Sequence, residues 1–203
     1  MANHQNSVPT TSGDFDKMYG SVLHWAWRDV RIPKELKQLA AKCKPESSLE
    51  LGCGAGLFTS FMADQGIKAT GVDFSKVAIE KSKKRIIGKG NQPEYIVGDV
   101  TDLKTLKEPF AVAFDVGCFH CLDEIGQQKY ASELYRLLKP DSILLIWALN
   151  NSPSDIKLTA DYMAEIFKNG FQLIGNKFSR RRIASSRWYW LMKNKEITKV
   201  NKQ

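Results

Sequence analysis

The sequence predicts an α/β protein built on a Rossmann-like, doubly wound sheet of about seven strands, mostly parallel with one antiparallel C-terminal strand. Two observations support this fold class. Apolar runs of strand length alternate with segments of helical periodicity as far as residue 150, a pattern typical of a parallel sheet with helices on both faces. After residue 150, two apolar runs are joined by only a short basic connection, so they should pair as antiparallel neighbours.

The apolar runs before residue 150 should form strands, and apolar residues at helical spacing predict helices between them. The expected strands are 47–52, 68–73, 94–98, 112–117 and 142–148. The expected helices are 57–66, 75–87 and 123–139. Gly66 and Pro140 are suitable residues for helix ends. Beyond a loop at 150–155, we expect a helix at 156–170 and strands at 171–178 and 187–194.

The segment 14–43 precedes the first expected strand and is rich in aromatic residues. It should form two helices, and Pro33 should open the second because proline is favoured in a first helical turn. We therefore expect a helical appendage at 1–44, a main domain at 45–194 and a basic tail at 195–203.

Length and composition fit a single domain. The chain has 203 residues, of which 43% are hydrophobic and 26% charged, enough apolar material for one buried core. No apolar run approaches the ~18 residues that a membrane span requires, and the opening residues are too polar for a signal peptide. We expect a cytoplasmic monomer without membrane attachment, in which the four cysteines are free thiols.

The net charge of +8 is concentrated near the C-terminus. Residues 174–203 contain nine Lys or Arg residues and one Glu, so nine minus one accounts for the whole excess. A solvated basic tail is the simpler interpretation, and an anion-binding segment is the alternative.

The most informative stretch is SSLELGCGAGLFTSFMADQGIKATGVDFS, residues 47–75. An apolar strand runs directly into Gly52, Gly54 and Gly56 and then into a helix. This order places bare backbone and a helix N-terminus at the carboxyl end of a parallel strand, where doubly wound folds bind ligands. A G-x-G-x-x-G dinucleotide motif would need a glycine where Leu57 or Thr59 stands, so a nicotinamide cofactor is disfavoured.

The segment ELGCGAG resembles the first motif, E/D-x-G-x-G-x-G, of the class I S-adenosylmethionine (SAM) dependent methyltransferases. Other segments follow in that family's order: GVDFS closing strand two, VGDV after strand three, then FDVGCFHCL and ELYRLLKPDSILLIWAL. The resemblance covers residues 45 to 149 or so. It departs from the family at Lys139-Pro140-Asp141-Ser142, where Lys-Pro-Gly-Gly is frequent.

The resemblance implies that the chain binds SAM and releases S-adenosyl-L-homocysteine (SAH). Asp73 would accept hydrogen bonds from both ribose hydroxyls, and Glu50 would help to orient the ammonium group. Asp99 would accept from the adenine amino group, and the Val100 amide would reach a ring nitrogen. The cofactor residues implied are Glu50, Gly52, Cys53, Gly54, Gly56, Asp73, Phe74, Asp99, Val100 and Gly117. Taken singly, each has an alternative role: turns for the glycines and Asp99, and a helix cap for Asp73.

The methyl acceptor should contact the loop after strand four, the leading segment and the loop after strand five. His120 is the expected catalytic residue, as general base or acceptor-positioning group, because an unperturbed imidazole titrates near neutrality. Simple packing of His120 is the alternative. The other acceptor candidates are Tyr19, His24, Trp25, Trp27, Cys118, Phe119, Cys121, Leu149, Asn150 and Asn151. Cys118 and Cys121 form a lone C-x-x-C, for which packing is favoured over a redox or soft-element role, and no metal site is expected.

Within the family, the layout is most similar to compact enzymes that methylate thiols, thiopurines or tellurium and selenium species. Their leading segment often forms a lid, for which Trp25 and Trp27 would be suited, although both could simply pack. The GCFHC segment replaces the Asn/Asp-Pro-Pro-Tyr/Phe motif of enzymes that methylate base amines or glutamine amides. We therefore expect a small-molecule acceptor with a sulfur, oxygen or nitrogen nucleophile.

Two alternatives remain open. A nucleic-acid methyltransferase would use Arg180, Arg181, Arg182 and the tail for phosphate contacts. A noncatalytic SAM-binding regulatory protein would keep the cofactor pocket and lack an acceptor site.

Overall fold

The computed structural model describes residues 11–20, 31–85, 91–179 and 185–195. Its strands are β1 Ser47–Leu51, β2 Lys68–Asp73, β3 Glu94–Val97, β4 Phe110–Val116, β5 Leu138–Leu149, β6 Phe171–Ser179 and β7 Ser186–Lys193. They form a seven-stranded sheet in the order β3-β2-β1-β4-β5-β7-β6. Strands β1 to β5 pair in parallel, whereas β7 is antiparallel to both of its neighbours, β5 and β6. The predicted doubly wound fold with one antiparallel strand is confirmed.

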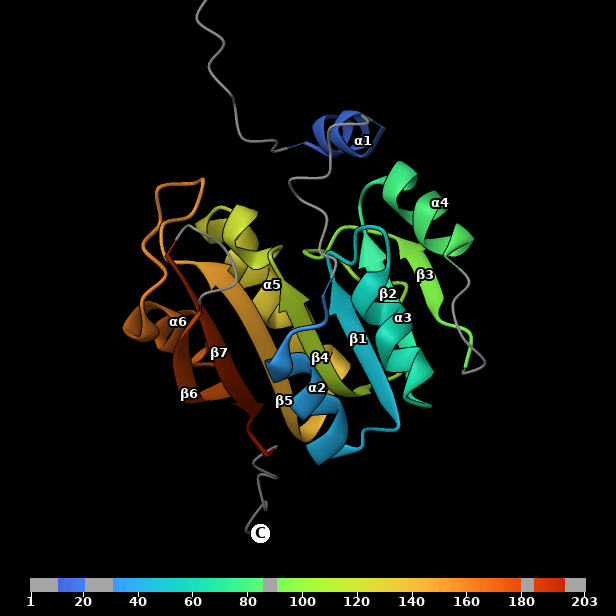
Figure 1. Ribbon diagram of the computed structural model, residues 1–203. Helices are drawn as coiled ribbons and strands as arrows, with labels where there is room; N and C mark the ends of the chain where they lie inside the picture. Colours follow the sequence, from blue (N-terminus) through green and yellow to red (C-terminus); the bar gives the residue numbers. More distant parts are fainter. Residues whose placement is uncertain (1–10, 21–30, 86–90, 180–184, 196–203) are drawn as a thin grey trace, which may run out of the picture.

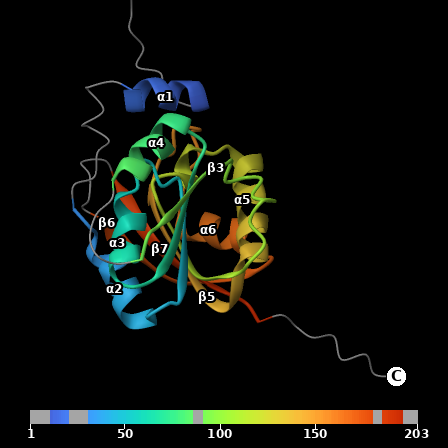
Figure 2. The same cartoon turned by 90° about the vertical axis from the view of Figure 1, so that its right-hand side faces the viewer.

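Helices cover both faces of the sheet (Figures 1 and 2). One face carries α2 Lys34–Cys43, α3 Leu57–Asp64 and α4 Lys76–Lys84, and the other carries α5 Glu124–Leu137 and α6 Ala160–Phe167. Helix α1, Ser12–Gly20, lies above the top edge of the sheet in the view of Figure 1. The leading segment thus forms the two helices expected of it, and Pro33 stands at the N-cap of α2.

The core is divided by the sheet, and β5 contributes to both halves. Leu144 and Ile146 belong to the cluster beneath α5 and α6, whereas Leu145 and Trp147 belong to the cluster beneath α2 and α3. Successive side chains of a strand point to opposite faces, so a strand covered on both sides must be apolar throughout. The burial of both faces of β5 explains why residues 143–149 form an unbroken apolar run.

Polar residues set where the helices begin. Ser75, Asp123 and Thr159 each accept a hydrogen bond from a backbone N–H in the first turn of α4, α5 and α6. Such caps satisfy N–H groups that have no partner within the helix. The first two were expected inside the helices, and the helix expected from residue 156 begins after Thr159.

The junction between α5 and β5 differs from the prediction. We expected the helix to reach residue 139 and end at Pro140, but α5 ends at Leu137 and β5 begins at Leu138. Phe110 pairs with Leu138 and Val112 with Ile143, so the intervening residues of β5 form a bulge. The pairing of Leu138 with Phe110 of β4 accounts for the early start, and the buried Lys193 adds a hydrogen bond from its Nζ to the Leu138 carbonyl oxygen at 2.7 Å.

Candidate functional site

A cavity of about 1070 Å³ lies at the carboxyl ends of the central parallel strands, beneath α1. Parallel strands all end at the same edge of a sheet, so segments distant in sequence meet there. Nine of the ten predicted cofactor residues line the cavity: Glu50, Gly52, Cys53, Gly54, Asp73, Phe74, Asp99, Val100 and Gly117. The tenth, Gly56, is not part of the wall.

The glycines after β1 are needed by the backbone and by neighbouring protein atoms. Gly52, Gly54 and Gly56 have φ values of 69°, 51° and 77°, in the left-handed region that favours glycine. A Cβ atom on Gly52 would lie 2.4 Å from Cys118 Cβ, and one on Gly54 would lie 2.5 Å from the Tyr19 hydroxyl. A side chain at either position would therefore clash within the protein, whether or not a ligand is bound. Gly56 shows this most clearly, because its neighbours belong to β3 and α4.

Asp73 joins the end of β2 to the glycine turn. Its side chain is buried, and its two oxygens accept hydrogen bonds from the Gly54 N–H at 2.8 Å and the Ser75 N–H at 2.9 Å. Burial raises the pKa of Asp73, although both hydrogen bonds lower it. Because Ser75 is the residue that caps α4, Asp73 is not the helix cap considered as its alternative. Each of its oxygens keeps a further lone pair for another donor.

Glu50 is a second buried carboxyl group on the cavity wall. It lies in β1, is 2% exposed and accepts a hydrogen bond from the Thr59 hydroxyl of α3. Burial raises the pKa of Glu50 well above its ordinary value, and the nearby charges of Asp115 and Asp73 raise it further. A cationic group entering the cavity would favour the ionised form.

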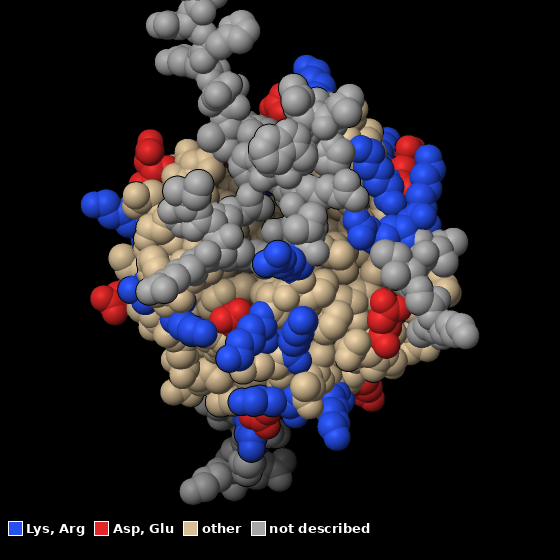
Figure 3. Space-filling model, viewed as in Figure 1, with Lys and Arg blue, Asp and Glu red and all other residues tan. Residues whose placement is uncertain are grey.

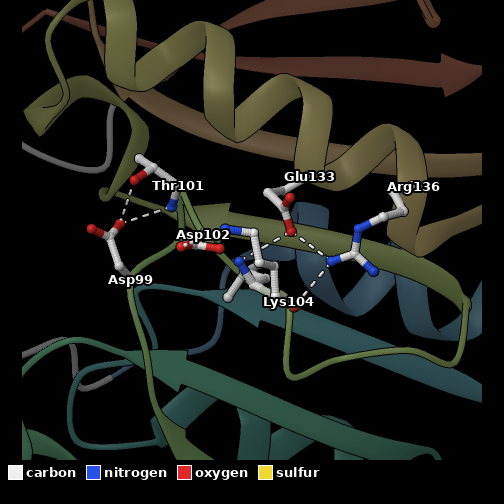
Figure 4. Close-up of polar contacts among 7 residues, drawn as sticks. Asp99, Thr101, Asp102, Lys104, Glu133 and Arg136 are labelled. Carbon is white, nitrogen blue, oxygen red and sulfur yellow. Dashed lines mark hydrogen bonds and ion pairs between the residues drawn. The ribbon is translucent and has the colours of Figure 1, made fainter.

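The loop after β3 supplies another part of the cavity wall. The Asp99 Oδ1 atom accepts hydrogen bonds from the Thr101 N–H and hydroxyl, both at 2.8 Å, as Figure 4 shows. Asp99 thus forms the turn considered as its alternative, and its Oδ2 atom is bonded to no described residue. Phe74 lies nearby at the end of β2, with its ring centroid 5.1 Å from that of Phe15 on α1.

Asp115 organises the loop after β4, and it is not among the residues predicted from the motifs. This fully buried carboxylate accepts hydrogen bonds from the N–H groups of Gly117, Cys118 and Phe119 and from the Tyr130 hydroxyl, at 2.8 to 2.9 Å. Burial raises its pKa to about 6. The signal was an acid inside the apolar run FAVAFDV, since an unpaired carboxylate is costly to bury.

This loop places three predicted acceptor residues on the cavity wall. His120 is 3% exposed and meets the Trp147 ring edge-on, with 5.9 Å between ring centroids. Cys118 and Cys121 also line the cavity. Phe119 does not, because its side chain packs in the core against Tyr130 and Phe167, which corrects its assignment as an acceptor residue.

The cysteines are free thiols, as predicted. Burial raises the pKa of Cys118 well above its ordinary value and that of Cys121 to about 12. Both thiols are therefore neutral at neutral pH and are poor nucleophiles. Within the residues that the structure describes, no three His, Cys, Asp or Glu side chains are grouped so that they could hold a metal ion.

Helix α1 covers the cavity through contacts with α4. The Asp16 carboxylate accepts hydrogen bonds from the Ser75 hydroxyl and the Val77 N–H, and Lys81 Nζ donates to the Tyr19 carbonyl oxygen. Tyr19, a predicted acceptor residue, lines the cavity, and burial raises its pKa. The other leading-segment candidates, His24, Trp25 and Trp27, lie outside the described residues.

The loop after β5 contributes less than expected. Leu149 lines the cavity, but Asn150 and Asn151 do not. Asn150 turns instead toward Ser185, where its backbone N–H donates to the carbonyl oxygen at 2.9 Å and its side-chain amide to the hydroxyl at 2.7 Å. The wall also contains residues that the motifs do not single out: Phe15, Met18, Leu57, Phe58, Thr101, Leu122, Ile125, Lys129 and Trp147. For Trp147, the alternation of faces along β5 was an available signal.

Sequence comparison shows what this chain is similar to. Residues 49–141 match the family model described as a methyltransferase domain. The ubiquinone biosynthesis O-methyltransferase of Xanthomonas axonopodis pv. citri is 28% identical over 145 residues, which cover 68% of this chain and 59% of that relative. The uncharacterized methyltransferase C750.03c of Schizosaccharomyces pombe is 25% identical over 107 residues, 53% of this chain and 74% of the relative. The match thus spans well under two thirds of the first relative's length.

Solved structures share the fold. The N-methyltransferase NodS from Bradyrhizobium japonicum WM9, in complex with SAH, superposes with a TM-score of 0.77 at 16% identity, covering 92% of this chain and 100% of that one. A TehB-like SAM-dependent methyltransferase from Corynebacterium glutamicum gives 0.67 at 18% identity, covering 91% and 98%. The resemblance inferred from the glycine turn is confirmed. Residues 49–141 thus match a methyltransferase-domain model, and the chain shares the fold of these SAM-dependent methyltransferases.

Proposed function

We propose that the protein is a SAM-dependent methyltransferase that transfers a methyl group to a small-molecule acceptor through a sulfur, oxygen or nitrogen nucleophile. One observation carries the proposal. A single cavity is lined both by residues that the family resemblance assigns to the cofactor, such as Asp73 and Asp99, and by the acceptor candidates His120 and Cys118.

The residues present fit SAM. After bonding to Gly54 and Ser75, each oxygen of Asp73 keeps a lone pair, so a pair of ribose hydroxyls has an acceptor. Glu50 offers a buried carboxyl group to the ammonium group of the amino acid portion. The volume of about 1070 Å³ is at the upper end of the ~300–1,000 Å³ that ligand sites usually occupy, which leaves room for a cofactor and a small acceptor together.

When bound, SAM supplies an electrophilic methyl group on a sulfonium. The protein's task is then to orient an acceptor and to exclude water. Met18 and Tyr19 of α1 cover the cavity, and Trp147 and Leu149 give it an apolar wall. His120, beside Trp147, would accept the proton that the acceptor loses.

A small acceptor is favoured by the contacts of the described basic residues near the C-terminus. Lys177 pairs with Glu35 at 3.1 Å, and Arg187 donates to Asn176 at 2.6 Å. Lys193 is buried. On the face shown in Figure 3, basic side chains over α2 and beside α4 have acidic side chains among them. The described basic residues near the C-terminus therefore do not form a free phosphate-binding patch. Arg180, Arg181 and Arg182 lie outside the described residues.

The names of the similar proteins agree with this class of acceptor. One relative is named for O-methylation in ubiquinone biosynthesis, and one structural neighbour is an N-methyltransferase. We also propose that the protein acts in the cytoplasm as a monomer, on the basis of its composition and free thiols. Among the helices of the described ranges, none has the length and apolar character that crossing a bilayer requires.

A screen with SAM labelled in its methyl group would test the proposal. Thiols, phenols, amines, chalcogen oxyanions and RNA would be offered as acceptors, with SAH binding measured in parallel by calorimetry. Transfer to a small molecule is the expected result. Salt-dependent transfer to RNA alone would favour a nucleic-acid methyltransferase, and SAH binding without any transfer would favour a noncatalytic SAM-binding protein. A protein that binds neither SAM nor SAH would overturn the proposal.

A further inference from the structure

We infer that Arg136 and Glu133 of α5 are positioning residues for the cofactor site, because together they fix the loop that carries Asp99, Val100 and Thr101 into the cavity wall. Neither Arg136 nor Glu133 lines the cavity. The inference rests on the proposed function, since it concerns how this loop meets the adenine of SAM or SAH.

The two side chains hold the loop by its backbone (Figure 4). Arg136 Nη1 donates to the Leu106 carbonyl oxygen at 2.8 Å, and Nη2 donates to the Leu103 carbonyl oxygen at 3.0 Å. Glu133 Oε2 accepts from the Leu103 N–H at 3.0 Å and from Arg136 Nη2 at 2.6 Å. One ion pair on a helix therefore satisfies three backbone groups of an irregular loop.

The loop depends on these bonds because part of it is buried. Leu103 is 1% exposed and packs in the core cluster beneath α5. Its backbone groups lie outside regular secondary structure. The carbonyl oxygen also accepts from the Leu106 N–H at 2.9 Å, whereas the N–H donates to Glu133 and would be costly to bury without it. The guanidinium group suits this role, since its planar, rigid fork can direct several N–H groups at once.

Short-range hydrogen bonds connect the fixed part of the loop to the cavity wall. Asp102 directly precedes Leu103, and its N–H donates to the Asp99 carbonyl oxygen at 3.0 Å. Thr101 donates twice to Asp99 Oδ1. These contacts hold the Asp99 carboxylate in one orientation and leave its Oδ2 atom as the available acceptor. A shift at Leu103 would move Asp99 and the Val100 amide together.

The same loop contains a matched control. Lys104 pairs with Asp102 at 3.2 Å, but the two side chains are 82% and 55% exposed and the pair bonds no backbone group of the loop. Such a solvent-exposed pair contributes little. Lys104→Gln removes one positive charge, as Arg136→Gln does, and leaves the backbone contacts in place.

The test compares SAH with S-inosyl-L-homocysteine, in which a carbonyl oxygen replaces the adenine amino group. Calorimetry would give both dissociation constants for the wild type, Arg136→Gln, Glu133→Gln and Lys104→Gln, and thermal unfolding would be followed for each. The wild type should prefer SAH. We expect Arg136→Gln and Glu133→Gln to lower that preference about 10-fold, the effect of one charge-assisted hydrogen bond, and Lys104→Gln to leave it unchanged.

A purely structural role would lower the unfolding temperature and weaken both ligands equally, so an unchanged preference in folded Arg136→Gln would overturn the inference. If Arg136→Gln does not fold, Arg136→Lys keeps the charge without the fork, and the same loss of preference is expected. An unchanged preference in Arg136→Lys would then overturn the inference. A wild type that binds neither compound would overturn the proposed function and this inference with it.

Discussion

At the scale of single residues, the cavity depends on buried acids. In the described part of the chain, Glu50, Asp73 and Asp115 are the acidic residues that are buried. Each has different hydrogen-bond partners. Glu50 accepts from the Thr59 hydroxyl, and Asp73 accepts from two backbone N–H groups. Asp115 accepts from three backbone N–H groups and the Tyr130 hydroxyl. Burial raises the pKa of all three. Ionised acids in such positions oppose folding, so their presence here points to function.

Replacing Asp115 should change how stability depends on pH. Burial raises its pKa from 3.8 to about 6, so the folded state holds the proton more tightly than the unfolded state. The resulting stabilisation is complete below about pH 4 and is lost as the pH rises through about 6, a change of about 3 kcal/mol. Urea unfolding of the wild type and Asp115→Asn across this range should show their free energies of unfolding diverging, with the wild type relatively more stable at low pH. A constant difference would contradict the assignment.

Asp73→Ala should weaken the binding of SAH by about 2–3 kcal/mol, because hydrogen bonds to a charged group would be lost. Calorimetry on the folded variant gives the dissociation constant. Asp64→Ala, at the exposed end of α3, is the control and should bind SAH as the wild type does. An unaltered dissociation constant in Asp73→Ala would remove this residue from the cofactor site.

His120→Ala should lower turnover by about 100-fold or more while leaving the affinity for SAM nearly unchanged, if His120 takes the acceptor's proton. The measurement is the pH–rate profile of both proteins with one identified acceptor. The limb of the wild-type profile that reports this base should vanish in the variant. With a thiol acceptor the loss of turnover would be smaller, because a fraction of the thiol is already present as thiolate near neutral pH. Identical profiles and rates would leave His120 only its packing against Trp147.

At the scale of elements, local patterns were predicted well and long-range contacts were not. The bounds of β2 agree with the prediction because its apolar pattern is local. The α5–β5 junction does not agree, since it depends on the pairing of Leu138 with Phe110 and on Lys193, which is 55 residues away in sequence. The cofactor wall was predictable because its motifs are contiguous. Asn150 was misjudged as a cavity residue because Ser185, which the sequence places far from it, binds both its backbone and its side chain.

The docking of α1 can be tested at the same scale. Asp16 accepts hydrogen bonds from Ser75 and Val77 in the first turn of α4, so Asp16→Ala removes a contact worth about 1 kcal/mol by analogy with a helix cap. We expect SAH to dissociate about fivefold faster, because α1 is held less firmly over the cavity. Stopped-flow displacement gives the rate, and Lys17→Ala, exposed on the same helix, is the control. Equal dissociation rates in the two variants would argue against the role of this contact.

At the scale of the whole molecule, the candidate cofactor cavity and the basic segment at residues 174–203 involve different strands of the sheet. The cavity opens where β1, β2 and β4 end, and the basic segment includes the antiparallel strand β7 and the end of β6. Among the described residues, none of the basic segment lines the cavity, which is consistent with a cofactor site that does not use the segment's charge.

Replacing Arg180, Arg181 and Arg182 together by glutamine should therefore leave SAH affinity and turnover on a small acceptor unchanged. Calorimetry and the methyl-transfer assay check the two parts of this expectation. If turnover on a small acceptor were abolished while the variant still bound SAH, these arginines would belong to a pocket for an anionic acceptor.

The strand order also has a consequence for synthesis on the ribosome. β6 pairs with β7 and not with β5, although it precedes β7 in the chain. The nascent chain therefore emerges with β6 unable to join the sheet, and β5 has one edge uncovered, until residues 186–193 have left the exit tunnel. During that interval the exposed edge of a long apolar strand is open to pairing with other chains. Completion of this sheet therefore waits for β7, and a chain cut short before β7 loses β6 as well.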